Sequence, residues 1–285
     1  AERMLAALAR AGDVLGPADH EGRGWIARAE GYGALVSGDA ATYLRKTEEA
    51  VRAFDAAQDE RHAVTFQTSV GFAHIALGLY ARAAEILTDA LARAERMNLA
   101  LTCAIAKHNL GYALGLAGEL QRGIAVEAEA VAEAERQNDR WIECVSQTYL
   151  AALLLRGGDF ARARAAAERG AELSDRPNRV VALALLARAD LGLGEPLRAL
   201  EAARESHQLL DELGSIEDGE GLARLLQVEV ERAAGNAATA NQWLSAARER
   251  LETRARAISD PELRASFLEC IPEHRDTLAL AKALG

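Results

Sequence analysis

The chain has 285 residues, of which 50% are hydrophobic and only 5% aromatic, with Ala and Leu supplying much of the hydrophobic share. Such a composition is typical of helices that pack closely through small side chains. The formal net charge of −10 argues against nucleic acids and anionic membranes as partners. No segment approaches the ~20 apolar residues of a membrane-spanning helix, and the start shows no signal-peptide pattern, so we expect a cytoplasmic protein.

Residues 1–16 predict one amphipathic helix that ends at Gly16-Pro17, either a leading cap or the second half of a repeat. After it, a turn glycine recurs at spacings of 40, 40, 40, 36 and 41 residues. These glycines are Gly38, Gly78, Gly118, Gly158, Gly194 and Gly235. A period this regular indicates one supersecondary unit stacked on copies of itself.

Each turn glycine separates two predicted helices, which gives six helical hairpins within residues 17–258. The hairpins span about 22–58, 61–97, 101–137, 141–175, 179–213 and 221–258. Turn-forming residues such as Asn98 and Asn138-Asp139 link neighbouring hairpins. We therefore expect an all-α fold, a right-handed α-solenoid (superhelix) of stacked helical hairpins.

Two segments depart from the repeat. The connection Gly214–Gly221 is the longest, most acidic and most glycine-rich of the links. We interpret it as a flexible solvated loop, with a functional loop or a hinge as the alternative. Residues 259–285 predict two short helices that begin at Ser259-Asp260-Pro261 and at Pro272, and we expect them to cap the last hairpin.

Small residues flank the turn glycines at constant distances, where the two helices of a hairpin cross and a large side chain would force the backbones apart. They precede the turn by seven positions at Gly31, Gly71, Gly111, Ala151 and Ala187, and follow it by five at Ala83, Gly123, Ala163, Ala199 and Ala240. This pattern resembles the tetratricopeptide repeat (TPR) family over roughly residues 22–256. HEAT and armadillo repeats have similar lengths but lack this glycine and small-residue pattern.

The period of about 40 residues is longer than the 34 of an ordinary TPR. Longer units resemble the superhelix of the MalT-type transcription activators and the C-terminal sensor arrays of bacterial multidomain ATPases and serine/threonine kinases. The tail from Leu263 to Ala281 is similar to segments that close such arrays. The resemblance implies the regulatory C-terminal part of a signalling protein whose kinase, ATPase or DNA-binding domain lies outside this fragment.

Motifs for catalysis or metal binding are absent from the sequence. There is no Walker loop, no His-Glu-x-x-His and no Cys-x-x-Cys, and nothing assembles a nucleophile, a base and an orienting group. The cysteines Cys103, Cys144 and Cys270 are interpreted as buried, inert thiols, and His274 as a solvated or capping residue. We therefore expect no enzyme, no cofactor and no metal.

In a TPR superhelix the first helix of each hairpin lines the concave groove. The polar and aromatic residues expected there are Thr68, Ser69, Phe72, His108, Asn109, Tyr112, Thr148, Tyr149 and Arg156. Polar groups that alternate with aromatics suit a peptide or a small polar ligand, although Phe72, Tyr112 and Tyr149 could equally pack between repeats. The basic residues with which TPR co-chaperones clamp a carboxylate are missing, so a chaperone-tail binder is disfavoured.

The sequence thus favours a non-catalytic module that binds a peptide, a protein segment or a small effector in the concave groove and signals to a fused or associated domain. The alternative is a purely architectural scaffold that stacks on itself or spaces other domains. Whether the chain forms a homodimer, and whether its own side chains fill the groove, are left open by the sequence.

Overall fold

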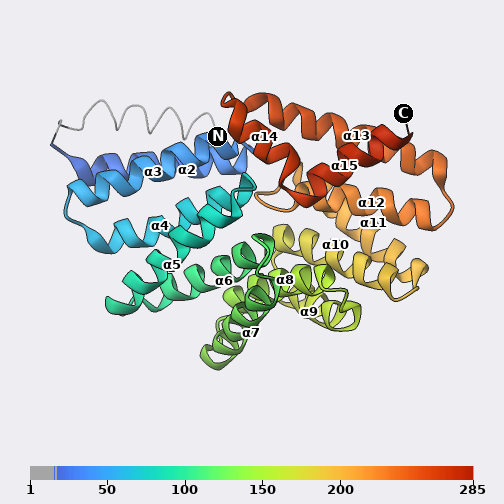
Figure 1. The fold of residues 1–285 in the computed structure, drawn as a ribbon, viewed down its shortest axis with the longest axis horizontal. Helices are drawn as coiled ribbons and strands as arrows, with labels where there is room; N and C mark the ends of the chain where they lie inside the picture. Colours follow the sequence, from blue (N-terminus) through green and yellow to red (C-terminus); the bar gives the residue numbers. More distant parts are fainter. Residues whose placement is uncertain (1–15, 17, 285) are drawn as a thin grey trace.

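The computed structural model describes residue 16 and residues 18–284, so the helix predicted for residues 1–16 lies almost wholly outside the described residues. Within the described part there are α-helices and no strands (Figure 1). The helices are α2 (His20–Val36), α3 (Ala40–Ala56), α4 (Glu60–Ala76), α5 (Tyr80–Arg96), α6 (Ala100–Leu116), α7 (Leu120–Gln137), α8 (Arg140–Arg156), α9 (Phe160–Leu173), α10 (Arg176–Gly192), α11 (Pro196–Leu213), α12 (Glu220–Ala233), α13 (Ala237–Ala257), α14 (Pro261–Glu269) and α15 (Pro272–Leu284).

The predicted turn glycines end the first helix of each pair. All six have φ between 76° and 106°, a left-handed conformation that other residues adopt only at a cost. The first three turns between pairs use Gln58, Asn98 and Asn138, which are also left-handed. The predicted helical hairpins are therefore present, and α2–α13 form stacked pairs.

Helix starts follow the capping rules. The side chains of Asp39, Asp59, Asp139 and Asp159 each accept a hydrogen bond from the backbone N–H three residues later. Asp175 does the same for α10, which therefore begins at Arg176, three residues before the start that the sequence suggested.

The small residues at the helix crossings allow backbone contact. A Cβ atom at Gly123 would lie 2.6 Å from the carbonyl oxygen of Gly111 and 2.6 Å from the amide nitrogen of Gly115. At Gly71 a Cβ would lie 2.5 Å from Leu87 Cγ, so the leucine fills the space that the glycine leaves. Close approach of the two helices is thus the reason for small residues at these positions.

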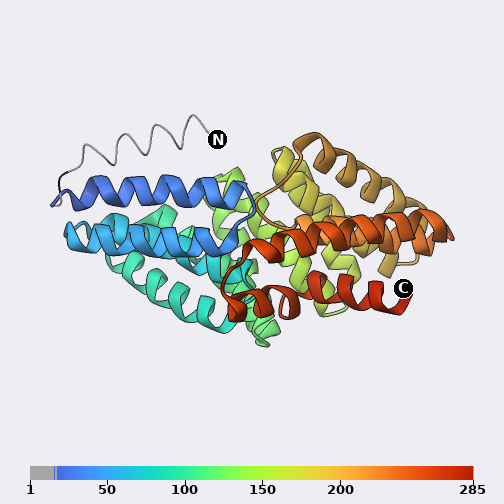
Figure 2. The same ribbon diagram turned by 90° about the horizontal axis from the view of Figure 1, so that it is seen from above.

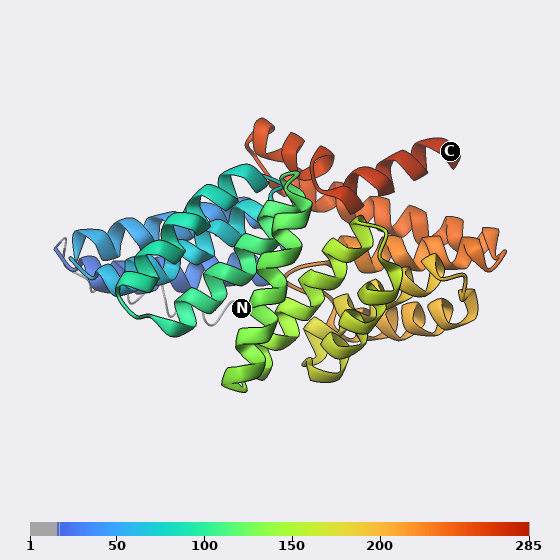
Figure 3. The same ribbon diagram turned by 60° about the horizontal axis from the view of Figure 1, so that its bottom comes forward.

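The two ends of the chain share one hydrophobic core. Leu35 and Tyr43 of the first hairpin and Leu77 of the second belong to the same cluster as Ile258 and Phe267. Figure 2 shows α13 reaching the ends of α2 and α3. Figure 3 shows α14 and α15 lying across one end of the N-terminal and the C-terminal hairpins. The capping helices therefore cover the first two hairpins as well as the last.

Two turns make the closest contacts in this closure. At Gly78 a Cβ would lie 2.9 Å from Cys270 Cβ and 3.0 Å from the carbonyl oxygen of Ser266. At Gly38 it would lie 3.2 Å from Arg254 Nε. The turn glycines of the first two hairpins thus have a second role, because they let the C-terminal part of the chain approach.

We expect Gly123→Ala to lower the free energy of unfolding by about 3 kcal/mol, because the new Cβ would meet rigid backbone on two sides. Gly158→Ala is the matched control, since a Cβ there meets nothing within 4 Å and only the left-handed φ of 76° opposes it. Its cost should be about 1 kcal/mol. Urea unfolding followed by circular dichroism measures both. Equal costs would contradict the close-approach interpretation.

Candidate binding site on the inner helices

The residues predicted to line the groove lie on three first helices, α4, α6 and α8. The aromatic side chains of α6 and α8 come together. The Tyr149 ring stacks on Tyr112 with centroids 3.9 Å apart and on His108 with centroids 4.4 Å apart. Phe72 on α4 packs edge-on to Tyr43 of α3, 6.2 Å between centroids. The rings thus form contacts between repeats, and those of His108, Tyr112 and Tyr149 form one continuous stack.

Three of the predicted polar residues are used within their own helices. Thr68 and Thr148 donate hydrogen bonds to the backbone oxygens of Thr65 and Cys144, and both threonines are buried. Asn109 is also buried, and its amide donates to the backbone oxygen of Ile105. These side chains present little surface to a ligand. Ser69 is half-buried and bonds the Tyr43 hydroxyl.

The connection between α11 and α12 enters the molecule and contacts the ring stack. Tyr149 Oη donates a 3.0 Å hydrogen bond to Asp218 Oδ2. Ile216 is only 5% exposed and shares a core with Val180 and Leu210. The expectation of a flexible solvated loop is therefore wrong, because one apolar residue and one hydrogen-bonded carboxylate hold the loop inside.

The same loop also contacts the first hairpin. Ser215 Oγ donates to the backbone oxygen of Val36 at 3.4 Å, and the carboxylate of Glu217 lies close enough to the Tyr32 hydroxyl to interact with it. The negative charge of Glu217 adds to that interaction in raising the pKa of Tyr32. Ser215, Glu217 and Asp218 therefore connect helices α2 and α8, which belong to the first and fourth hairpins.

An ionic cluster fixes the loop where α12 begins. The carboxylate of Glu220, which is 2% exposed, accepts hydrogen bonds from Arg224 at 2.9 Å and from Arg250 at 2.8 and 3.1 Å. Arg254 lies 3.8 Å away. Burial alone would raise the pKa of Glu220, but the bonds and charges of these arginines hold it below its ordinary value. Glu220 is thus ionised, and its buried charge is compensated.

Two further carboxyl groups near the tyrosines are held toward the neutral form. Burial raises the pKa of Asp218, and burial together with the nearby Asp218 charge raises the pKa of Glu273 to about 7. Burial likewise raises the pKa of Tyr112 and Tyr149. The charges of Glu273 and Asp218 both raise the pKa of Tyr112. The loop, the capping helix α15 and the ring stack therefore form one electrostatic unit.

A cleft of about 540 Å³ opens beside this unit, between the α4–α5 turn and the capping helices. Arg156 lines it with Tyr80, Arg82, Cys270 and Arg275. Arg82, Arg156 and Arg275 are all exposed, so three guanidinium groups border one cleft of an acidic protein. The sequence pointed to Arg156 but missed the others, because Arg82 and Arg275 are 193 positions apart and only the closure of the chain brings them together.

Two sequence interpretations of the capping region are corrected. Cys270 is exposed at the end of α14 and Cys103 is half-buried, whereas Cys144 is buried as expected. His274 is buried and not solvated, and its Nδ1 lies 2.8 Å from the backbone oxygen of Phe267 in the last turn of α14, in agreement with the capping alternative. Gly221 leaves room for the ring, since a Cβ there would lie 2.8 Å from His274 Nε2. Burial lowers the pKa of His274 to about 4, so the ring is neutral at pH 7.

Another buried histidine, His108, is paired with a buried carboxyl group. His108 Nδ1 lies 3.8 Å from Glu127 Oε2, and Gly111 provides the space for the glutamate. Burial lowers the pKa of His108 to about 3 and raises that of Glu127 well above its ordinary value. Burial therefore favours the neutral form of both groups, so the pair is not held together by opposite charges.

Among the described residues, no three His, Cys, Asp or Glu side chains are placed to hold a metal ion. None of the helices in that part of the chain combines the length and the apolar character needed to cross a bilayer.

No family model and no curated protein matches the sequence. Solved structures do match the fold. A Rap protein complexed with competence and sporulation factor is similar with a TM-score of 0.72 and 12% identity, over 99% of this chain and 82% of that chain. The Rap conjugation gene regulator of the plasmid pLS20, in complex with the Phr* peptide, is similar with a TM-score of 0.69 and 12% identity, over 92% of this chain and 76% of that chain.

The APC/C hetero-tetramer Cut9–Hcn1 gives a TM-score of 0.54 and 11% identity, over 99% of this chain and 59% of that chain. The fold is a TPR-like α-solenoid. At these identities the likeness concerns the fold alone. The TPR-like solenoid nevertheless agrees with the helical pairs, the turn glycines and the small residues at the crossings.

We expect Tyr149→Phe to lower the free energy of unfolding by about 1–2 kcal/mol, because Asp218 loses a buried hydrogen-bond donor. Hydrogen exchange should become faster in residues 215–219. Tyr112→Phe is the control, since its ring belongs to the same stack but has no hydrogen bond to the loop in the described structure. Unchanged exchange in Tyr149→Phe would contradict the role of this bond.

The raised pKa of Glu273 predicts a pH dependence. The folded protein keeps this proton up to about pH 7, whereas the unfolded chain loses it near 4.5, so stability falls as pH rises through that window. Glu273→Gln should remove the loss and be about 1–3 kcal/mol more stable than the wild type at pH 8. Denaturation at pH 5 and pH 8 tests this, with the exposed Glu269→Gln as control. Equal pH dependence in both variants would contradict it.

Proposed function

We propose that this chain is a non-catalytic binding module that takes a peptide or protein segment in the arginine-lined cleft between the α4–α5 turn and the capping helices. The observation that carries the proposal is that three exposed guanidinium groups, those of Arg82, Arg156 and Arg275, border this one cleft. Leu79, Leu116 and Pro272 supply apolar contact area in its wall, while the three arginines supply donors for a carboxylate. The ligand that fits best is a peptide with an acidic side chain or a free C-terminus.

The structural neighbours support a peptide ligand. Two similar TPR-like solenoids were solved with a bound factor or peptide, one with competence and sporulation factor and one with the Phr* peptide. A small anionic effector that uses the same arginines is the second candidate ligand class, because the cleft has the size of an ordinary small-molecule site.

Binding would be transmitted through the packing of the C-terminal helices against the first two hairpins. The cleft lies between the second hairpin and the capping helices, so a ligand there contacts both ends of the solenoid. It would favour the arrangement in which the ends are packed together, and the loop at Asp218 would move with them. A fused or associated kinase, ATPase or DNA-binding domain would receive this change, as in the MalT-type and multidomain signalling proteins of the bacterial cytoplasm.

The alternative is a scaffold without a groove ligand. The exposed apolar residues Trp25, Tyr32, Trp141 and Leu197 are its basis, since an apolar outer surface favours self-association into a homodimer or longer stack. A molecular mass that rises with concentration, together with an empty peptide screen, would favour this function over ligand binding.

The test is a screen of peptides with free and amidated C-termini against the purified chain, read by fluorescence anisotropy. Arg156→Glu should weaken binding by at least about tenfold, because it places a carboxylate against the ligand's own. Arg122→Glu is the matched control, as Arg122 occupies the position of Arg82 in the next hairpin but lies outside the cleft. Equal affinities of the two variants would overturn the proposed site.

A further inference from the structure

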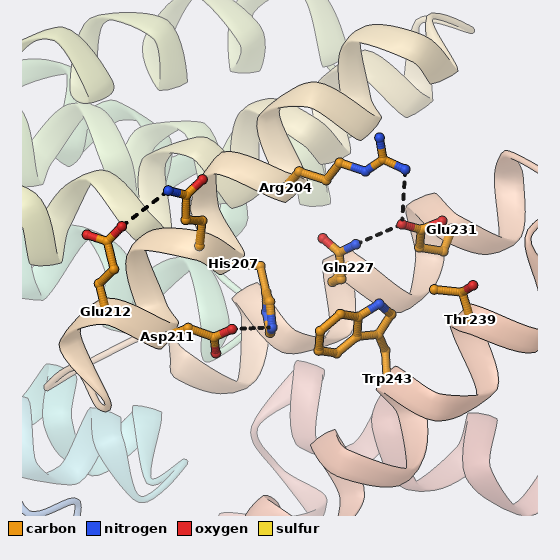
Figure 4. A pocket seen from close by; sticks show the side chains of 9 residues that line it. Arg204, His207, Asp211, Glu212, Gln227, Glu231, Thr239 and Trp243 are labelled. Carbon is orange, nitrogen blue, oxygen red and sulfur yellow. Dashed lines mark hydrogen bonds and ion pairs between the residues drawn. The ribbon is translucent and has the colours of Figure 1, made fainter.

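A second cleft of about 540 Å³ lies between α11, α12 and α13, on other side chains than the ring stack and the arginine cleft. Figure 4 shows His207 of α11, Gln227 and Glu231 of α12 and Trp243 of α13 facing one another across it. The Trp243 ring stands edge-on to the His207 ring, with centroids 4.2 Å apart. The cleft is therefore built by the fifth and sixth hairpins together.

The repeat shows that this lining is unusual. At the position of Gln227, eight residues before the turn glycine, the second to fifth hairpins have Val70, Leu110, Leu150 and Leu186. At the position of His207, thirteen after it, the first four hairpins have Val51, Leu91, Val131 and Ala171. Apolar residues that pack between hairpins elsewhere are thus replaced here by a buried imidazole and a buried amide.

These two polar groups have no partners for much of their hydrogen-bonding capacity. His207 is 6% exposed, and neither ring nitrogen makes a hydrogen bond among the described residues. Its Nε2 lies 3.4 Å from Asp211 Oδ2, at ion-pair distance only. Gln227 is 3% exposed; its amide nitrogen donates to Glu231 Oε1 at 3.0 Å, while its carbonyl oxygen has no donor in the described structure. Buried polar groups without partners destabilise a fold, so a ligand that pairs them is favoured.

The long link between α11 and α12 is what opens the cleft. In the earlier hairpins the second helix packs along the first helix of the next unit, whereas α11 packs less extensively on α12. Helix α12 also packs more extensively on α10 than the first helices of the other neighbouring hairpins pack on each other. The loop from Gly214 to Gly219 allows this shift, and Ile216 fixes it by packing in the core between α10 and α12.

The charge of the cleft identifies the kind of ligand. Asp211, Glu212 and Glu231 line it against one basic side chain, Arg204, and Glu212 is also ion-paired with Arg176. Burial lowers the pKa of His207, so the imidazole does not balance the charges of Asp211 and Glu231 at neutral pH. The cleft is therefore negative, and Trp243 adds an aromatic face of the kind that attracts cations.

Arg204 shows which cation fits. Its guanidinium reaches over the mouth of the cleft to within 3.7 Å of Glu231 Oε1, yet its side chain is 62% exposed (Figure 4). A guanidinium group is planar, carries five N–H donors and stacks on aromatic rings. The Gln227 carbonyl without a donor in the described structure, the carboxylates and the Trp243 ring match those properties, and an incoming guanidinium would displace the exposed end of Arg204.

We propose that the cleft between α11, α12 and α13 is a binding site for a guanidinium group. Gln227 Oε1 and the carboxylates of Glu231 and Asp211 accept its N–H donors, and Trp243 covers its face. The group comes either from a free arginine-like molecule or from an arginine side chain of a partner peptide. This site does not depend on the peptide site at the arginine cleft, whose charge preference is the opposite.

The experiment uses the whole chain and three probes, L-arginine amide, the peptide Ac-Gly-Arg-Gly-NH2 and its citrulline counterpart. Citrulline has the same shape but no charge. The readouts are calorimetry and the indole N–H signal of Trp243, assigned with Trp243→Phe. Both arginine probes should bind and shift this signal, and the citrulline peptide should not. Tighter binding of the peptide identifies a side chain as the source, and equal or tighter binding of arginine amide identifies a free molecule.

Three variants make the test specific. Glu231→Gln should weaken binding by at least about tenfold, and Arg204→Ala should strengthen it several-fold by removing the competing guanidinium. Gln227→Leu restores the residue of three other hairpins, so it should fold, melt at a higher temperature and bind no arginine probe. Absence of binding by both arginine probes at millimolar concentration, equal binding of citrulline, or unchanged binding in Gln227→Leu would overturn the proposal.

Discussion

The packing of the C-terminal helices against the first two hairpins is the constraint on which the rest of the structure depends. Leu77 shares a core with Ile258 and Phe267, although 181 and 190 positions of the sequence separate it from them. This core brings Arg275 to the turn of Gly78 and so creates the arginine cleft. It also places Glu273 near Tyr112, where burial holds the carboxyl toward its neutral form. Neither feature would exist in an open stack of the same hairpins.

The loop before α12 is the second feature that determines the arrangement of the helices, because its contacts affect the surroundings of both clefts. On its inner side Asp218 bonds Tyr149 and Glu217 interacts with Tyr32, so the loop occupies space that an open superhelix would leave to a ligand. On its outer side the length of the loop lets α12 pack on α10, and the buried His207 and Gln227 line the second cleft. The two clefts differ in charge, with arginines around one and carboxylates around the other. One chain thus offers two surfaces of opposite preference.

The sequence predicted the hairpins well and the tertiary contacts poorly, for a physical reason. The left-handed glycines and the small crossing residues act within one hairpin, so their period of about 40 residues could be read directly. The stack of Tyr112 and Tyr149 was partly foreseen for the same reason, as it joins neighbours. Burial of Ile216 and His274 depends on partners far along the chain, and a loop rich in Gly and Asp has the composition of an exposed turn. His207 and Gln227 carried a readable signal, because they replace apolar residues of the other hairpins.

The shared core of the two ends changes how such a chain should unfold. A linear solenoid has only neighbour contacts, so its terminal units fray first and its cooperativity is limited. Here Phe267 and Ile258 pack against the first two hairpins, so these hairpins have neighbours on both sides and are not the free end of a stack. Loss of that one interface would convert a single cooperative transition into stepwise melting from both ends. The same contact raises the mean sequence separation of interacting residues, so folding is expected to be slower than for an open stack of the same hairpins.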